Sequence, residues 1–126
     1  YLVHEGALSG ILDWEFAAFG DPLEDLGWML ARCWRFGAYR REAGGMGSRQ
    51  SLLDGYEAEA GHAVDRGLVP YWEVMATVRW AVVALQQAER HHSGAEPSLE
   101  LALTGQVLPA LELDLLTRIA EIEAGR

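Results

Sequence analysis

The fold of this chain is decided by the stretch Ser9-Gly-Ile-Leu-Asp-Trp-Glu-Phe-Ala-Ala-Phe-Gly-Asp-Pro-Leu-Glu-Asp-Leu26. A short apolar run leads into an acidic pair, Asp13 and Glu15, which Trp14 separates. Side chains alternate along extended chain, so the two carboxylates are expected on the same side. Gly-Asp-Pro then breaks the extended run and begins a helix. Carboxylates at the end of an extended segment are a common way to hold a cation near a phosphate.

Asp21 is the expected N-cap of the helix that follows. Its side chain can accept from the open backbone N–H groups, Pro22 suits the first helical position, and Glu24 lies three residues after the cap. Apolar residues then recur at helical spacing, which predicts a helix to about residue 34 or 35. These residues are Leu23, Leu26, Gly27, Leu30 and Trp34.

Short apolar runs at 1–3 and 9–12 flank a turn region that contains Gly6. Glycine supplies the positive φ of a tight turn, so these runs predict a β-hairpin. Two strands alone are marginal in water, so the hairpin is expected to need a partner, either the following helices or upstream chain. Downstream, Ser48 is expected to cap a helix over 49–60 that Gly61 ends.

A third helix is predicted over 70–92 and is apolar nearly all round between residues 74 and 85, which indicates a central position. Arg79 lies in that apolar stretch and needs a buried anionic partner. We predict a partner within the 13–25 segment, foremost Asp25. A last helix is expected after Ser98, with a kink or break over 105–109 because Pro109 removes a backbone donor.

The predicted fold is therefore mostly α, with a short N-terminal hairpin followed by about four helices. The 126 residues suit one domain, with the hairpin and candidate metal-binding segment over 1–20 and a helical part over 21–126. The formal charge of −9, with arginine as the only cation besides histidine, argues against binding to nucleic acid or to an anionic membrane. The single cysteine, Cys33, excludes an internal disulfide and fits a cytoplasmic location.

Asp13 and Glu15 are the first candidate site, as ligands of Mg²⁺, which prefers carboxylate oxygens and completes its shell with phosphate and water. Structural roles are expected for Asp21, as the helix cap, and for Asp25, as the partner of Arg79. An alternative is a di-metal carboxylate bundle, because Glu59-Ala-Gly-His62 and Glu89-Arg-His-His92 share the Glu-x-x-His spacing. Each motif would need a further carboxylate, for which Glu100 and Glu112 are available. Both motifs fall at predicted helix ends, which argues against a bundle core.

The Ile11-Leu-Asp-Trp-Glu and Gly20-Asp-Pro-Leu-Glu-Asp-Leu elements resemble the aminoglycoside phosphotransferase family, small-molecule kinases with a protein-kinase-like fold. The later stretches 71–80 and 92–102 are similar to a branch associated with acyl-CoA dehydrogenases. The resemblance identifies Asp13 with the metal-binding Asp of the kinase DFG motif. It implies ATP and Mg²⁺ as cofactors and a small molecule with a hydroxyl group as substrate, with Glu15 beside the metal or the substrate.

The family's catalytic His-Gly-Asp-x4-Asn loop and its ATP-binding N-terminal lobe have no counterpart in the 126 residues. The resemblance therefore implies the C-terminal, substrate-side part of a kinase C-lobe, which we expect to be inactive alone. The missing N-terminal lobe, or a second copy of the chain, is expected to cover the hairpin. The other function that we consider is a non-catalytic kinase-like module that binds a partner.

Overall fold

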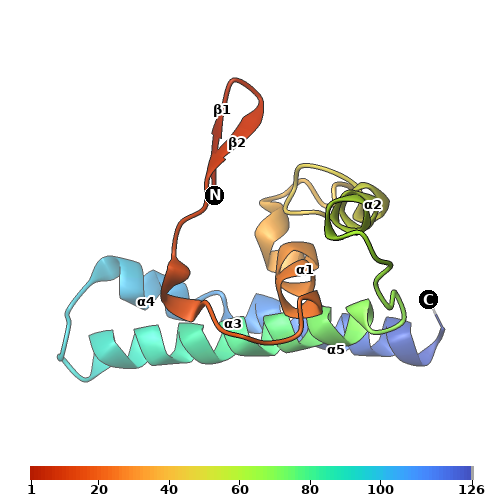
Figure 1. Cartoon of the computed structure of the whole chain (residues 1–126). Coiled ribbons are helices and arrows are strands. Elements are labelled where there is room, and N and C mark those ends of the chain that lie inside the picture. The colour runs from red at the N-terminus through yellow and green to blue at the C-terminus, as the bar shows by residue number, and fades with distance from the viewer. Residues whose placement is uncertain (126) are drawn as a thin grey trace.

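The structure is a computed structural model that describes residues 1–125, apart from the side chain of Glu15. Figure 1 shows a hairpin that stands away from a helical body. The strands are β1 (Leu2–His4) and β2 (Ala7–Gly10), and two short 3₁₀ helices are η1 (Trp14–Phe16) and η2 (Arg32–Arg35). The α-helices are α1 (Leu23–Leu30), α2 (Arg49–Ala60), α3 (Val69–His92), α4 (Leu99–Gly105) and α5 (Leu108–Glu123). The predicted fold class, mostly helical after a short hairpin, is confirmed.

The hairpin turns through Glu5 and Gly6, whose φ angles of 51° and 79° are both positive. Positive φ at both central residues is the geometry that matches the twist of a two-residue hairpin. The strands pair antiparallel, with His4 opposite Ala7. Both strands are exposed, and the hairpin projects from the helices (Figure 1). Within residues 1–125, the partner expected for the hairpin is therefore not supplied by the helices.

Helix α3 is the centre of the helical body, as its apolar composition predicts. It packs against α1 on one side and against α4 and α5 elsewhere along its length (Figure 1). A compact core forms where α1, α2 and the start of α3 meet, built from Leu23, Leu26, Leu30, Ala43, Leu53 and Val69. The hairpin connects to this body through the segment that contains η1, and Arg79 of α3 contacts Phe16 of η1.

Helix α1 ends at Leu30, four or five residues earlier than the sequence predicts. Ala31 is buried and extended, with φ −57° and ψ 138°, and the chain continues as η2. Two carbonyls that would accept hydrogen bonds within a longer helix accept them from other groups instead. The Gly44 N–H donates to Met29 O at 2.9 Å, and Arg35 Nη2 donates to Leu30 O at 3.0 Å. The helix stops because these groups satisfy its last carbonyls.

The other helix boundaries follow local signals. Ser48 Oγ accepts from the Ser51 N–H at 3.0 Å to cap α2, and Gly61 ends that helix with φ 72°. The predicted break in the last helix is found between α4 and α5, with Pro109 in the first turn of α5. Among the residues described, no helix combines the length and apolar character needed to cross a membrane.

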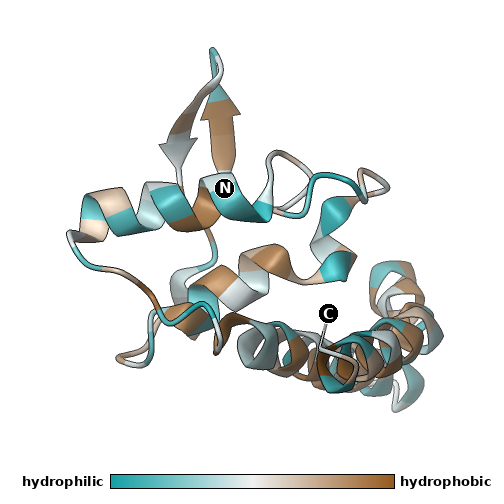
Figure 2. Ribbon diagram, turned by 90° about the vertical axis from the view of Figure 1, so that its right-hand side faces the viewer, coloured by the Kyte–Doolittle hydropathy of each residue, from teal (hydrophilic) through white to brown (hydrophobic). Residues whose placement is uncertain are grey.

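Hydrophobic residues occur in the hairpin as well as in the helices, as the colours of Figure 2 show. The hairpin and the following segment expose large apolar residues, including Leu8 at 62%, Trp14 at 68% and Phe19 at 110% relative accessibility. Surface patches of this kind mark interaction sites when they are contiguous. The N-terminal 20 residues thus carry an apolar surface that the helical body leaves uncovered.

Candidate functional site

Asp13 lies between the hairpin and η1, immediately before Trp14. Its backbone is left-handed, with φ 60° and ψ 49°, a conformation that aspartate adopts more readily than most residues. Trp14 Nε1 donates to Ile11 O at 3.0 Å and so closes the turn around Asp13. The Asp13 side chain is exposed and has no hydrogen-bond partner in the described part of the chain. It is a carboxylate that remains available to a ligand.

Glu15, the other acidic candidate, has its backbone in η1, but its side chain lies outside the described residues. The extended geometry expected over 13–15 is wrong, because Asp13 is left-handed and residues 14–16 form a 3₁₀ turn. Alternation along a strand therefore does not relate the two acidic side chains. The role predicted for Glu15 stays a prediction.

A magnesium site can be tested against the donors near Asp13. The described residues contain no group of three or more His, Cys, Asp or Glu side chains that could hold a metal ion. Mg²⁺ typically takes only one or two protein carboxylates and fills its octahedral shell with phosphate and water. The exposed Asp13 carboxylate therefore fits a single ligand of such a site.

Arg79 of α3 pairs with Glu24 of α1, so the predicted partner within residues 13–25 is confirmed, while the foremost candidate, Asp25, is wrong. Successive residues on a helix point about 100° apart, so Glu24 faces α3 while Asp25 is exposed and makes no ion pair within residues 1–125. Arg79 and Glu24 keep side-chain exposures of 41% and 39%, so the expected burial of the pair is also wrong. The pair therefore lies at the partly exposed edge of α1 and not in the core.

Arg79 also joins η1 to the helical body. Its Cζ lies 5.2 Å from the ring centre of Phe16 and 5.9 Å from that of Trp28. Such cation–π contacts, together with the Glu24 pair, hold the residues just after Asp13 against α1 and α3. The N-cap of α1 is Pro22, one residue after the predicted Asp21, but Asp21 still supports the start of the helix, since its Oδ1 accepts from the Leu23 N–H at 2.9 Å. The residues just after Asp13 are thus held against the helical body through Arg79.

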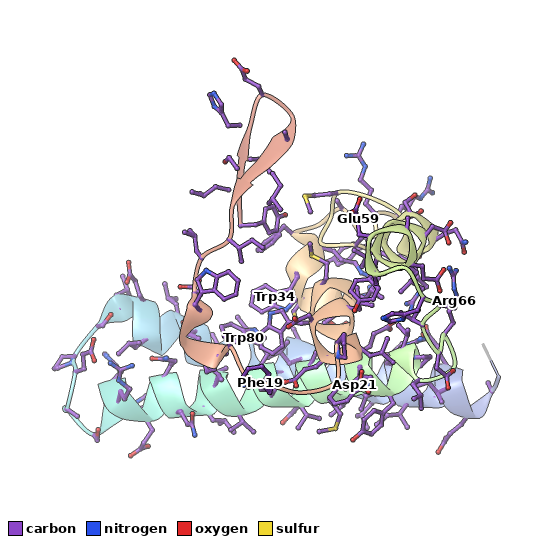
Figure 3. All side chains as sticks on the ribbon, viewed as in Figure 1. Phe19, Asp21, Trp34, Glu59, Arg66 and Trp80 are labelled. Atoms are coloured by element: carbon purple, nitrogen blue, oxygen red, sulfur yellow. The ribbon has the colours of Figure 1, made fainter. Side chains whose placement is uncertain are left out.

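An aromatic cluster lies beside Trp28 and Arg79. The ring centre of Trp34 is 5.0 Å from that of Trp80, 5.6 Å from that of Trp28 and 6.3 Å from that of Phe36. Figure 3 shows Trp34 and Trp80 close together between α1 and α3. Trp28 belongs to this cluster and to the Arg79 contact, so the aromatic surface continues toward η1. The rings are tilted by 31–55° to one another and form a largely apolar cluster.

A second polar cluster was not predicted from the sequence. Glu73 on α3 is only 4% exposed and contacts Arg49 of α2 and Arg118 of α5. Arg118 Nε lies 2.8 Å from Glu73 Oε2. The available signal was that Glu73 shares the helical register of the buried residues Val69, Ala76 and Thr77, which places a carboxylate on a buried face. Its partners, Arg49 and Arg118, are 24 and 45 positions away in the sequence, and no sequence pattern indicates that they contact Glu73.

The structure does not support the di-metal alternative or a reactive cysteine. The two Glu-x-x-His motifs end α2 and α3, and these ends lie on opposite sides of the molecule (Figure 1). Burial raises the pKa of the Cys33 thiol to about 11, so it is protonated at neutral pH. A protonated thiol is a poor nucleophile.

Comparison with known proteins gives one match. A family model described as "Phosphotransferase enzyme family" matches residues 1–76, which is more than half of the 126 residues. The matched region includes the hairpin, Asp13, α1, α2 and the first turns of α3. No curated protein and no solved structure gives a significant match.

Proposed function

The chain belongs to the phosphotransferase enzyme family, and from this premise we propose that it forms the substrate-side part of an ATP-dependent small-molecule kinase. In the reaction, the oxygen of a substrate hydroxyl bonds to the γ-phosphorus of ATP. The bond from that phosphorus to the β-γ bridging oxygen breaks, ADP leaves, and the hydroxyl proton passes to a base. The observation that carries the proposal is the free, exposed carboxylate of Asp13 within the matched region.

Asp13 is proposed to bind Mg²⁺ that accompanies ATP. When bound, Mg²⁺ neutralises charge on the β- and γ-phosphates. The left-handed backbone and the Trp14–Ile11 hydrogen bond hold the Asp13 backbone in a closed turn. The Arg79 contacts to Phe16 and Glu24 keep the residues after that turn against the helical body. The exposed carboxylate projects from this fixed backbone and is free to bind a cation.

The base is proposed to come from residues outside the 126, because the sequence contains no His-x-Asp-x4-Asn element. Activity then requires a polypeptide or complex that joins such an element to this chain. The aromatic cluster around Trp34 supports a substrate with a ring or an acyl portion, which those side chains would contact, while its hydroxyl is directed to the phosphate.

The test compares Asp13→Asn with Asp25→Asn in protein that carries both this chain and the upstream catalytic element. Asn tolerates the left-handed backbone, so the first substitution removes charge without adding strain. Asp25 is exposed and has no ion pair in the described structure, which makes it the matched control. We expect Mg²⁺-dependent ATP turnover to fall at least about a hundredfold in Asp13→Asn and to be unchanged in Asp25→Asn.

Equal turnover in both variants would show that Asp13 is not the metal ligand. A direct readout is Mn²⁺ binding by electron paramagnetic resonance in the presence of ATP, which should weaken only in Asp13→Asn. The non-catalytic alternative is favoured by one observation, the uncovered apolar surface of residues 1–20. Wild-type protein that binds neither ATP nor Mn²⁺ after addition of the catalytic element would support that alternative.

A further inference from the structure

A polar cavity of about 160 Å³ lies between the α1–η2 junction, the start of α2, α3 and α5. Four of the ten arginines line it, namely Arg32, Arg35, Arg49 and Arg118. Exposed residues, among them Arg32 and Thr117, form part of its wall, so solvent reaches it. The wall also carries four carboxylates, so its formal charge is zero in a chain of net charge −9.

Three of these arginines are already paired with carboxylates of the cavity wall. Arg32 Nε lies 3.1 Å from Asp114 Oδ1. Arg49 contacts the buried Glu73 and, through Nε at 3.3 Å, Glu42.

Arg118 completes the set of paired cations. It shares Glu73 with Arg49, and its Nη1 lies 3.0 Å from Glu121 Oε2. With these contacts, each of the four carboxylates in the wall is engaged by an arginine other than Arg35.

Arg35 is the exception. It donates to two backbone carbonyls, Leu30 O at 3.0 Å and Tyr39 O at 3.3 Å, and forms no ion pair within residues 1–125. Its Nε is buried and has no hydrogen-bond partner among the described atoms. Burial lowers the pKa of Arg35, and the charges of Glu42 and Glu73 offset that effect only in part. A partly buried cation without a counter-ion is costly, and a bound anion would relieve that cost.

We propose that this cavity binds a small oxyanion, a phosphate or carboxylate group, with Arg35 as its principal cation. A guanidinium has five N–H donors; two donate to the carbonyls and the Nε–H is buried, which leaves one N–H on each of Nη1 and Nη2 for a ligand. Planar guanidinium groups match the spacing of phosphate and carboxylate oxygens. The volume corresponds to about five water molecules at ~30 Å³ each, which suits one such group with some water. The inference does not depend on the phosphotransferase assignment.

The test titrates inorganic phosphate, and separately acetate, into the 126-residue chain at constant ionic strength. The Arg35 Nε–H resonance is followed by NMR, and the unfolding temperature is measured in parallel, because a ligand of the folded state raises it. We expect a saturable shift of that resonance, and the anion that binds more tightly shows which group the site prefers. Absence of a saturable shift with both anions would overturn the proposal.

Three variants sharpen the test. Arg35→Gln should weaken anion binding about tenfold or more, since a charge-assisted contact is lost. Asp114→Asn removes a negative charge from the wall and should tighten binding several-fold. Arg90→Gln is the control, because Arg90 pairs with Glu96 away from the cavity, and its binding should equal that of the wild type.

Arg35 also supports the end of α1, so Arg35→Gln could lower stability. The wild-type NMR titration and the gain of affinity in Asp114→Asn do not rely on that variant. If all variants bind phosphate with the same affinity, the anion is not held in this cavity.

Discussion

Gly27 of α1 lies directly against the backbone of Trp72 of α3. A Cβ atom placed on Gly27 would stand 2.5 Å from the Trp72 carbonyl carbon and 2.6 Å from its Cβ, closer than real Cβ atoms come. The two helices therefore approach at a point where only glycine fits. This contact lies between the segment that carries Asp13 and the centre of the helical body.

Replacing Gly27 by alanine is predicted to destabilise the fold. The new methyl group cannot be accommodated without moving one helix, because the atoms that it meets belong to backbone and to a Cβ. Overpacking of this kind costs about 2 kcal/mol or more. Urea unfolding followed by circular dichroism measures the change in the free energy of unfolding. Gly55→Ala is the control: nothing lies within 4 Å of its new Cβ and it is inside α2, so we expect a gain of roughly 0.5–1 kcal/mol.

Replacing Glu73 by glutamine is predicted to be costly for a different reason. Arg49 and Arg118 both use the Glu73 carboxylate, and their side chains are only 26% and 20% exposed. Neutralising Glu73 leaves Arg49 with only Glu42 and Arg118 with only Glu121, both of which are more exposed. The loss of the buried charge-assisted contacts costs about 2–3 kcal/mol. Denaturant unfolding checks this value.

Glu96→Gln supplies the comparison for Glu73→Gln, because its pair with Arg90 is about half-exposed. Exposed pairs contribute about 0–1 kcal/mol. A Glu73→Gln protein no less stable than Glu96→Gln would contradict the structural importance of the buried cluster.

The decrease in folding stability at low pH is predicted to depend on Arg66. Its Nη2 lies 2.6 Å from Asp54 Oδ1 and from Glu57 Oε2, and hydrogen bonds from Arg66 are the main cause that lowers the pKa of both carboxylates. A lowered folded-state pKa stabilises the fold above the unfolded pKa of about 4, and this contribution is lost as the pH falls through the folded value. Wild-type stability should therefore decrease below about pH 4.

The matched variants are Arg66→Gln and Arg41→Gln. Arg66→Gln should be less stable than the wild type at pH 7, and its stability should decrease less than that of the wild type when the pH is lowered. Arg41 is exposed and has no ion pair in the described structure, so its variant should follow the wild type. Denaturation midpoints at pH 7 and pH 3 provide the comparison. An identical loss in Arg66→Gln and the wild type would show that this cluster does not govern the acid response.

The local elements of the fold were predictable because their causes lie within a few residues. The contact of Asp21 with the Leu23 N–H at the start of α1, the Ser48 cap, the glycine that ends α2, and the break near Pro109 each depend on groups no more than four positions away. The end of α1 was not predictable, because it depends on the Gly44 N–H and on the Arg35 side chain rather than on propensity. The left-handed bend at Asp13 was not predicted either, because the run Ile-Leu-Asp-Trp is typical of extended chain.

The sequence by itself determined the helical class, the hairpin turn, most helix boundaries and the resemblance that singles out Asp13. Those features follow from backbone conformation and hydrogen bonds between near neighbours, which residue type controls directly. Tertiary structure alone decided that Arg79 meets Glu24 rather than Asp25, and that Glu73 gathers Arg49 and Arg118 beside the unpaired Arg35. Such pairings depend on how whole helices are rotated and spaced, and that arrangement is set by close packing such as the contact of Gly27 with Trp72.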